Sequence, residues 1–392
     1  MRCFVNTIFG QLLQFLPRNK FNQYVGQHET DKLVRKMTTW NQFNIMLFAQ
    51  AKGMDSLRDI ETSFNLHKEA WYHLGIKTVA KSTLADANQN RSYEVYEKLF
   101  YALFESCKEI LPERVFDFKN PLYSFDSTII KLCLSVFNWA KYTRFKGALK
   151  IHTLLNNRST IPEFMTITDG KVGDLNGIKL MDLEKLEKNS IIVFDRAYID
   201  YSWWYRLNQK GIFFVSRVKS NQNIFVTGQH EAGLEKNILA DEIVIFGDYD
   251  TIKKAKYPEK LRRVKFYNEE KKKIYTYLTN NFTLTATQIA QIYKERWQIE
   301  LFFKRVKQNL KIKTFLGTSK NAVLTQIWIA MIYYLLLAYI KFQTKFKKSL
   351  LDLTRIVRET LMIRRNFIDL LSLTPETIHK IKDIESQQLS FW

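Results

Sequence analysis

The order of predicted elements between residues 122 and 215 is the feature that most constrains the fold of this chain. Runs of apolar and β-branched residues predict strands, and stretches with apolar residues at helical spacing predict helices. Seven elements are predicted, in this order: strands at 122–137, 147–155 and 164–168, a helix at 174–186, a strand at 191–194, a helix at 201–208 and a strand at 212–215. Three consecutive strands favour an antiparallel meander, and the later alternation favours parallel pairing beside it. The sequence therefore predicts an α/β fold built on a mixed sheet.

The segments on either side of this sheet have a different character. Residues 1–115 read as several short helices with basic residues between them, a pattern that suits a DNA-binding domain and suits a structural helical cap equally well. Short β-type runs at 243–246 and 273–279, separated by charge clusters, predict a β-rich insertion at about 220–283. We therefore expect three parts: a helical N-terminal domain (1–115), a catalytic domain (116–345) and a helical C-terminal tail (346–392).

The charge of the chain indicates a class of partner. Sixty Lys and Arg residues against thirty-nine Asp and Glu residues give a formal net charge of +21. Such an excess favours a polyanion, and nucleic acid first; a basic solvated surface is the alternative. Cys3, Cys107 and Cys133 lack metal-ligand spacing, and so sparse a set suits a reducing cytoplasm.

One apolar stretch, Asn321 to Ile340, carries no charge and approaches the length of a membrane span. Its start is polar, with Thr325 and Gln326 close behind Asn321, and the sequence has no second span. These features favour a helix buried in a large core over a membrane anchor.

A second informative segment lies between residues 293 and 307. If it is one helix, Tyr293, Arg296, Glu300 and Lys307 fall within an arc of roughly 60° on one face. A carboxylate lined up with two cations and a phenol is a poor core stripe. It is a suitable surface for holding a metal ion beside a phosphate group.

Two further carboxylates stand out by their surroundings. Asp126 lies within an apolar strand, and Asp195 ends the short apolar strand at 191–194. Buried carboxylates are rare unless they are paired or bind metal, and the end of a central strand is a usual place for a functional residue. Together with Glu300 they predict a site for two hard divalent cations, of which Mg²⁺ fits best, acting on a phosphodiester.

Each acid also has a structural alternative. Taken singly, these alternatives are at least as strong as the catalytic interpretation: pairing of Asp126 with Lys131 or Arg144, capping of a helix by Asp195 or pairing with Arg196, and pairing of Glu300 with Lys304 or Arg296. The order of the three acids along the predicted elements, strand, strand end and late helix, favours the metal site.

These motifs resemble those of bacterial insertion-sequence transposases of the DDE superfamily, in the subgroup marked by a Tyr-Arg-Glu-Lys signature (the type of insertion-sequence family four). The signature is matched without a gap by Tyr293, Arg296, Glu300 and Lys307. The segments Phe-Asp126-Ser and Val-Phe-Asp195-Arg-Ala-Tyr resemble the first and second acid blocks of the family. The resemblance extends from about Asn6 to Phe342.

The resemblance implies a ribonuclease-H-like core with a β-rich insertion between the second Asp and the Glu. It implies cut-and-paste transposition, in which the ends of the element are nicked, released through a hairpin and joined to target DNA. Asp126, Asp195 and Glu300 would hold two Mg²⁺ ions, with Mn²⁺ able to replace them. Tyr293, Arg296 and Lys307 would grip phosphates, and the DNA complex would contain at least a dimer.

The insertion supplies further candidates for DNA contact. The basic residues Lys253, Lys254, Arg262 and Arg263 suit contacts to the DNA backbone. Relatives stack a flipped base on a Trp in the last part of the insertion, where this chain has Tyr275 and Tyr277 instead. Either tyrosine can stack a base, and strand pairing is the alternative role.

The function expected from sequence is therefore cut-and-paste transposition by a metal-dependent nuclease and strand transferase. It would act on double-stranded DNA, both transposon ends and target, in the bacterial cytoplasm and without a membrane. A catalytically inactive DNA-binding protein derived from a transposase is the main rival. A ribonuclease-H-type nuclease without strand transfer and a membrane-anchored protein are the others.

Overall fold

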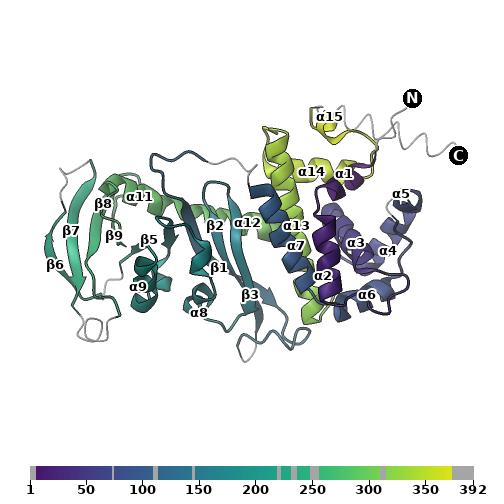
Figure 1. Ribbon diagram of the computed structural model, residues 1–392, viewed down its shortest axis with the longest axis horizontal. Helices are drawn as coiled ribbons and strands as arrows, with labels where there is room; N and C mark the ends of the chain where they lie inside the picture. Colours follow the sequence, from purple (N-terminus) through teal and green to yellow (C-terminus); the bar gives the residue numbers. More distant parts are fainter. Residues whose placement is uncertain are drawn as a thin grey trace. The chain divides into compact units, whose positions relative to one another are not determined.

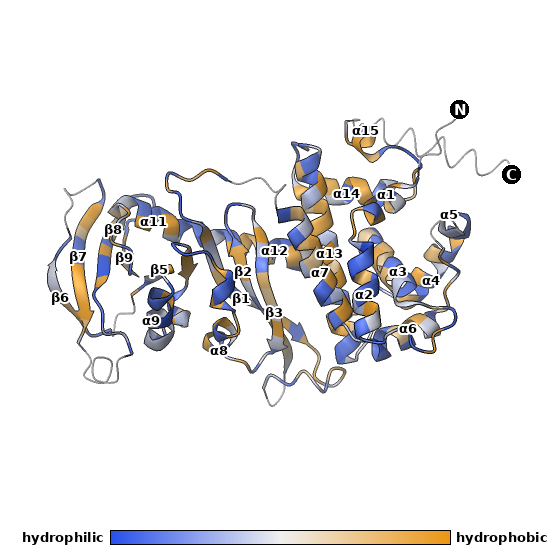
Figure 2. Ribbon diagram, in the orientation of Figure 1, coloured by the Kyte–Doolittle hydropathy of each residue, from blue (hydrophilic) through white to orange (hydrophobic). Residues whose placement is uncertain are grey.

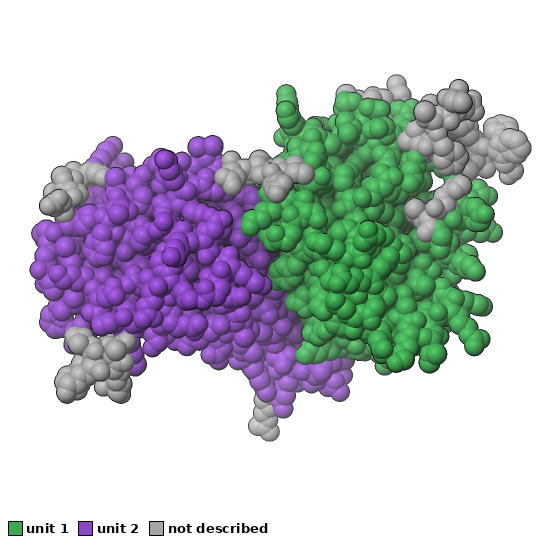
Figure 3. Space-filling model, in the orientation of Figure 1, with its two compact units in different colours: residues 1–111, 305–392 green, residues 112–304 purple. Residues whose placement is uncertain are grey.

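The computed structural model describes residues 6–72, 75–108, 114–143, 146–218, 222–230, 236–247, 256–309 and 315–372. The chain forms two compact units, which Figure 3 distinguishes by colour. One unit contains residues 112–304, and the other combines residues 1–111 with residues 305–392.

The 112–304 unit is built on a nine-stranded sheet in the order β3-β2-β1-β4-β5-β9-β8-β7-β6. Its first five strands are β1 (Leu122–Leu132), β2 (Gly147–Asn156), β3 (Ile161–Asp169), β4 (Ile191–Phe194) and β5 (Phe213–Arg217). β1, β2 and β3 pair antiparallel, while β4 pairs parallel with both β1 and β5. This confirms the predicted meander with parallel strands beside it, and the order 3-2-1-4-5 is that of a ribonuclease-H-like core.

The insertion continues this sheet. Its strands are β6 (Ile224–Gln229), β7 (Ile238–Phe246), β8 (Leu261–Asn268) and β9 (Lys273–Thr279). β9 pairs antiparallel with β5, so the insertion strands are hydrogen-bonded to the core sheet and do not form a separate layer. The sequence indicated β7 and β9 but not β6 or β8. β8 was hidden by its cations, since Arg262, Arg263 and Lys265 interrupt its apolar residues.

Helices cover both faces of the sheet (Figure 1). On one face, α11 (Ala286–Glu295) packs Ile289 and Ile292 against Val193 and Val215. On the other face, α8 (Asp174–Lys179) and α9 (Tyr201–Gln209) cover a cluster that includes Phe125 and Phe194. Two short 3₁₀ helices, Leu183–Lys185 and Arg196–Tyr198, connect these elements. We call the two sides the α11 face and the α9 face.

The long helix expected around Glu300 is broken at Arg296. Thr285 caps α11 with a capping box to Gln288. Arg296 then ends α11, and α12 runs from Trp297 to Asn309. At the break, the Arg296 and Ile299 amides bond to carbonyls three residues earlier. The continuous helix predicted from sequence is therefore wrong, because tighter bonds interrupt it within the signature.

The other unit is helical. Its helices are α1 (Ile8–Gln14), α2 (Arg18–Gln27), α3 (Thr39–Lys52), α4 (Leu57–Leu66), α5 (Lys68–Tyr72), α6 (Lys81–Asn90), α7 (Glu94–Cys107), α13 (Lys320–Gln343), α14 (Leu350–Thr360) and α15 (Phe367–Leu371). α13 is its central helix, in contact with α7, α3, α6 and α14. Figure 2 marks the apolar residues of α13 in orange.

The apolar stretch 321–340 is thus a core helix, as predicted. α13 is the one helix in the described part of the chain that is long and apolar enough to cross a membrane, and 94% of its most apolar window is buried. Its burial also explains why the compact units differ from the three expected segments. The C-terminal helices complete the core around α7 and α3, so they belong with the N-terminal helices.

Candidate active site

Asp126 and Asp195 are brought together by the register of two parallel strands. Phe125 of β1 is paired with Phe194 of β4, and each acid follows its phenylalanine directly. Both phenylalanines face the α9 side. Because successive side chains in a strand alternate between faces, both acids point to the α11 face. The sequence predicted both strands, and the structure places their acids side by side.

Asp126 is held from three sides. The Ser127 amide donates to its Oδ1 at 2.8 Å, and the Tyr198 hydroxyl donates to the same oxygen at 3.3 Å. Arg296 Nη1 lies 3.7 Å from Oδ2. Burial raises the pKa of Asp126 to about 6 in spite of the lowering by Ser127 and Arg296, and the nearby charge of Asp195 raises it further. This carboxyl is therefore costly to ionise unless a cation lies beside it.

Arg296 links Asp126 to the third acid. Its Nη2 donates to Glu300 Oε1 at 2.6 Å, one helical turn further along the chain. Its side chain is 15% exposed, and its buried Nε has no hydrogen-bond partner in the described part of the chain. Burial alone would lower the pKa of Arg296, but Tyr293, Glu300 and Asp126 raise it above its ordinary value. The guanidinium thus neutralises two of the three candidate ligands.

The three acids fit a hard divalent cation by donor type, since Mg²⁺ and Mn²⁺ prefer carboxylate oxygens. Across the described ranges, no three His, Cys, Asp or Glu side chains are gathered closely enough to hold a metal ion. In the structure the Glu300 carboxylate accepts a hydrogen bond from Arg296 instead.

The structural alternatives have mixed outcomes. Asp195 is the residue that precedes the 3₁₀ helix at 196–198, but its side chain makes no capping hydrogen bond. Glu300 does pair with Arg296, one of the partners considered for it. Arg144, a partner considered for Asp126, lies outside the described residues, and Arg296 takes that place. The Glu300–Arg296 pair is thus observed, while the metal site stays a prediction.

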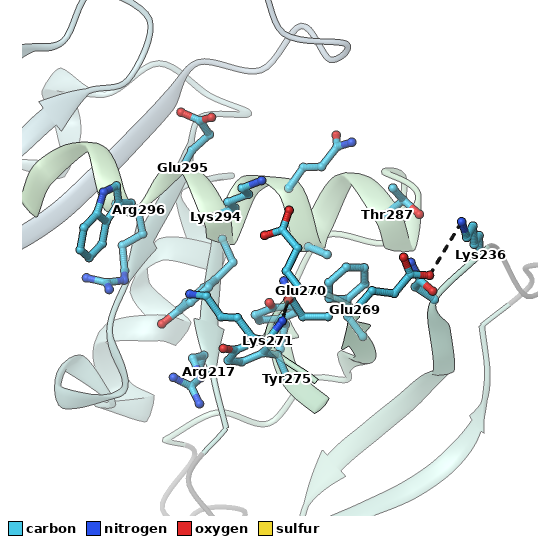
Figure 4. A pocket seen from close by; sticks show the side chains of 18 of the residues that line it. Arg217, Lys236, Glu269, Glu270, Lys271, Tyr275, Thr287, Lys294, Glu295 and Arg296 are labelled. Atoms are coloured by element: carbon cyan, nitrogen blue, oxygen red, sulfur yellow. Dashed lines mark hydrogen bonds and ion pairs between the residues drawn. The ribbon is translucent and has the colours of Figure 1, made fainter. Parts of the chain in front are cut away.

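A pocket of about 920 Å³ opens beside the signature residues (Figure 4). Its lining comes from α11 and the start of α12 on one side, and from β5, β8, β9 and the turn between β8 and β9 on the other. Among its lining residues are Arg217, Phe266, Tyr275, Tyr277, Tyr293, Lys294, Arg296 and Trp297. Glu269, Glu270 and Glu295 also line it. The pocket thus has aromatic faces and charges of both signs, and its rings and arginines suit a nucleic-acid strand with unstacked bases.

The aromatic residues of the pocket differ in access. Tyr277 is 5% exposed and packs against Tyr293, with ring centroids 4.9 Å apart. Tyr275 is half-buried, and the Arg217 guanidinium lies 5.0 Å from its ring centre. Trp297 is 55% exposed. Tyr277 is therefore part of the wall, which corrects its expected role in stacking, while Tyr275 and Trp297 offer ring faces.

The basic residues of the insertion that were predicted to contact DNA differ in exposure and in ion pairing. Lys253 and Lys254 lie outside the described residues. The structure corrects the expectation for Arg262: its side chain is 1% exposed and forms a two-point ion pair with Asp241, at 2.8 Å and 2.7 Å. It also donates to backbone carbonyls at Asn281 and Leu284, so no donor faces outward to meet DNA. Arg263 is 17% exposed and pairs with Glu242 at 2.6 Å.

The remaining signature residues lie on different helices. Tyr293 is on α11, where burial raises its pKa, and the charge of Asp195 adds to that rise while Arg296 opposes it. Lys307 is in the last turn of α12, in the part of the chain that belongs to the helical unit. Its role stays a prediction.

Sequence reasoning missed three residues at this site. Tyr198 orients Asp126, and it ends the same second acid block that contains Asp195. Trp297 directly follows Arg296 within the signature segment, and that position was the overlooked signal. The structure shows that its side chain is exposed. Arg217 gave no signal of its own, because its place in the pocket follows from the pairing of β5 with β9.

Comparisons with known proteins identify a family and several relatives of this chain. A family model described as the transposase DDE domain matches residues 117–336, and one described as a domain of unknown function matches residues 5–77. The protein named transposase y4zB of Sinorhizobium fredii is 33% identical over 72% of this chain and 78% of its own length.

Two further relatives carry insertion-sequence names. A transposase for insertion sequence element IS5377 of Geobacillus stearothermophilus is 26% identical over 69% of this chain and 70% of its own. A transposase for insertion sequence element IS4SA of a Synechocystis strain is 24% identical over 78% of this chain and 83% of its own.

Proposed function

Since this chain belongs to the transposase DDE-domain family, we propose that it catalyses cut-and-paste transposition of an insertion sequence. The observation that supports the proposal is that Asp126 and Asp195 follow paired residues of neighbouring parallel strands, while Arg296 contacts both Asp126 and Glu300. The family implies dependence on divalent metal, and we propose two Mg²⁺ ions, replaceable by Mn²⁺. When bound by the three acids, they would activate the attacking oxygen and stabilise the leaving oxygen of the phosphodiester.

The residues of the chain would then act in defined ways. Asp126 and Asp195, fixed on neighbouring parallel strands, present their carboxylates in a constant relation. Tyr198 and the Ser127 amide keep Asp126 in one orientation. Buried surroundings strengthen the electrostatic interactions of these carboxylates.

Arg296 would exchange partners when DNA binds. In the free protein it is paired with Glu300 and lies beside Asp126. A phosphate group would offer the Arg296 guanidinium a stronger acceptor. When the guanidinium moves to the phosphate, the Glu300 carboxylate would be free to bind metal. Tyr293 and Lys307 would hold other positions on the same backbone.

Other parts of the chain would position the DNA. Tyr275 and Trp297 provide ring faces for a flipped base beside the acids. Arg263, Lys253 and Lys254 would contact the backbone, and the helical domain at 1–115 would bind the transposon end. Two transposon ends and a target require at least a dimer in the DNA complex, in the bacterial cytoplasm where that DNA is found.

The test is strand cleavage of the element's own terminal repeats, with Mg²⁺ or Mn²⁺ and the full chain. Asp126→Asn, Asp195→Asn and Glu300→Gln are each expected to lower cleavage at least about 1000-fold, equivalent to ~4 kcal/mol of transition-state stabilisation. Asp169→Asn is the matched control, because Asp169 is an exposed carboxylate at the end of β3. Circular dichroism of each variant checks that it is folded.

The outcomes separate the candidate functions. Cleavage that persists in one of the acid variants removes that residue from the centre. Wild-type protein that binds the repeats but does not cut them would identify an inactive DNA-binding relative. Cleavage without joining to a target duplex would identify a nuclease without strand transfer.

A further inference from the structure

The sheet carries a second hollow, of about 350 Å³, that is separate from the pocket beside Tyr293. Its lining residues come from β5, β6, β8 and β9 and from the turn after β4. They are Arg196, Arg217, Val218, Gln222, Ile224, Arg263, Lys265, Ile274 and Thr276. We call it the basic groove.

The basic groove lies on the α9 face, opposite the pocket of Figure 4. Arg263 is paired with Leu278, which belongs to the cluster under α9, and Lys265 is paired with Thr276. Tyr277 alternates with these residues on β9 and belongs to the cluster under α11. β9 therefore places its aromatic rings in the first pocket, on the α11 face, and its alternate side chains in the basic groove, on the α9 face.

The lining of the groove has charge of one sign. Four of its lining residues are cations. Among the described residues that line it, none is acidic. Glu242 neutralises part of this charge from the next strand, since it lies 2.6 Å from Arg263 and 3.8 Å from Lys265. Neither Arg196 nor Arg217 has an ion pair with a carboxylate in the described ranges. The groove is thus a concave cationic surface, which favours a polyanion.

The two hollows meet at the ends of the central strands. Arg217, the last residue of β5, lines both of them. Arg196 lines the groove and directly follows Asp195. From β5 across β9 to β8 is about 10 Å at the usual strand spacing, which equals roughly three base-pair rises along the axis of a DNA duplex. A backbone that passes the acids can therefore continue around the end of β5 without leaving cationic surface.

We propose that the basic groove binds the phosphodiester backbone of the DNA strand that continues past the acidic centre. Arg196 and Arg217 guide the strand around the sheet edge, and Arg263 and Lys265, oriented by Glu242, hold the phosphates beyond it. This inference rests on the proposed function, because the strand is assigned to DNA bound at Asp126, Asp195 and Glu300. The same chemistry suits transposon-end DNA and target DNA.

A photo-crosslink tests the proposal directly. Ile274 lines the groove and is 58% exposed, so the photoreactive residue p-benzoylphenylalanine can replace it. Leu180 is a matched control, 55% exposed at the end of α8 and outside the groove. The full chain is irradiated with two duplexes: one carrying the terminal repeat with flanking DNA, and one of unrelated sequence. We expect a crosslink from position 274, a few nucleotides from the cleaved phosphate, and none from position 180.

Charge substitution adds a second measurement. Lys265→Gln removes a partly exposed cation and should reduce the crosslink and lower the slope of log affinity against log salt by about one. Arg196→Gln should do the same, while Lys131→Gln on β1 should not. A crosslink confined to the repeat duplex assigns the groove to end DNA, and one confined to the unrelated duplex assigns it to target DNA.

Two results separate this inference from the proposed function. Equal labelling from positions 274 and 180 in a preparation that cleaves the repeats overturns the groove and leaves the transposase proposal intact. Absence of cleavage in wild-type protein that still crosslinks at position 274 supports the groove and removes the assigned chemistry.

Discussion

Two arginines of the same unit, Arg262 in the insertion and Arg296 in the candidate site, contact carboxylates in contrasting ways. Arg262 is 1% exposed, meets both oxygens of Asp241, and donates to carbonyls at Asn281 and Leu284. Arg296 is 15% exposed, makes one short bond to Glu300, and leaves its Nε without a partner among the described residues.

The difference teaches how to distinguish a structural ion pair from a functional one. A buried guanidinium whose three nitrogens all donate hydrogen bonds joins two strands and a turn, and it gains little from a new ligand. A guanidinium with an unused donor beside an open pocket can change partner at little cost. The same residue type therefore has every nitrogen engaged in one region and an unused donor in the other.

The largest expected effect comes from a substitution that breaks the ion pair between Arg262 and Asp241. Arg262→Leu leaves the buried Asp241 carboxylate with only His230 Nδ1 beside it, at 3.5 Å, and we expect the free energy of unfolding to fall by about 3–5 kcal/mol. Urea unfolding measures the change. The double variant Asp241→Leu/Arg262→Leu should recover most of the loss, because the unpaired charge is removed.

Arg263 provides the matched control for that experiment. It also pairs with a carboxylate of β7, but its side chain is 17% exposed. Arg263→Leu should cost about 1 kcal/mol or less, since solvent screens such a pair. Equal losses for the two arginine variants would contradict the distinction drawn between saturated and partly exposed pairs.

A second experiment sharpens the comparison from the side of the site. Arg296→Gln should change stability by less than about 1 kcal/mol, yet reduce end cleavage about 100-fold, equivalent to ~2.7 kcal/mol. At pH 8 and without DNA, it should also bind Mn²⁺ more tightly than wild type, because the guanidinium no longer competes for Glu300. Electron paramagnetic resonance of free Mn²⁺ measures that affinity.

Lys304→Gln is the control for Arg296, because Lys304 is an exposed cation one turn after Glu300 on the same helix. It should leave Mn²⁺ affinity close to that of wild type. Weaker Mn²⁺ binding by Arg296→Gln than by Lys304→Gln would show that the arginine assists the cation and does not compete with it.

The smallest expected effect concerns a buried carboxylate without a strong counter-ion. Burial raises the pKa of Glu97 on α7 to about 7, and the like charge of Glu94 adds to the rise, while Lys98 only partly opposes it. A carboxyl whose pKa is higher in the folded state favours folding below its unfolded pKa of 4.5 and loses that contribution as pH rises to about 7.

Glu97→Gln should therefore stabilise the protein at pH 8 by about 1 kcal/mol after allowance for solvent screening, and not at pH 4. Urea unfolding at both pH values provides the measurement. Glu105→Gln on the exposed side of α7 should show no such pH dependence. A gain from Glu97→Gln that is the same at both pH values would exclude ionisation as its cause.

The strands of the core could be predicted from sequence because burial there depends on local pattern. The run at 191–194 is apolar on both faces, as in a strand buried on both sides. Because side chains alternate along a strand, the pairing of β1 with β4 determines the face to which Asp126 points. The same alternation determines the face of Asp195. Arg262 could not be assigned in this way, because its partner Asp241 lies on another strand and a charged residue gives no local sign of burial.

The break at Arg296 also lay beyond the sequence. Tyr293 to Lys307 contains neither Gly nor Pro, so its composition favours an unbroken helix. At the observed turn, Arg296 contacts Asp126, a residue 170 positions earlier in the numbering. Tertiary pairing of this kind overrides helix propensity.

The pairing of β5 with β9 has one more consequence. The chain leaves the core at Arg217 and returns on the neighbouring strand, opposite that residue at Tyr277. The insertion thus begins and ends on two neighbouring, hydrogen-bonded strands, β5 and β9. Whatever lies between can lengthen, shorten or be exchanged without rethreading the strands that bear Asp126 and Asp195. This pair of strands is an attachment point, at which one cutting core can carry different DNA-reading surfaces.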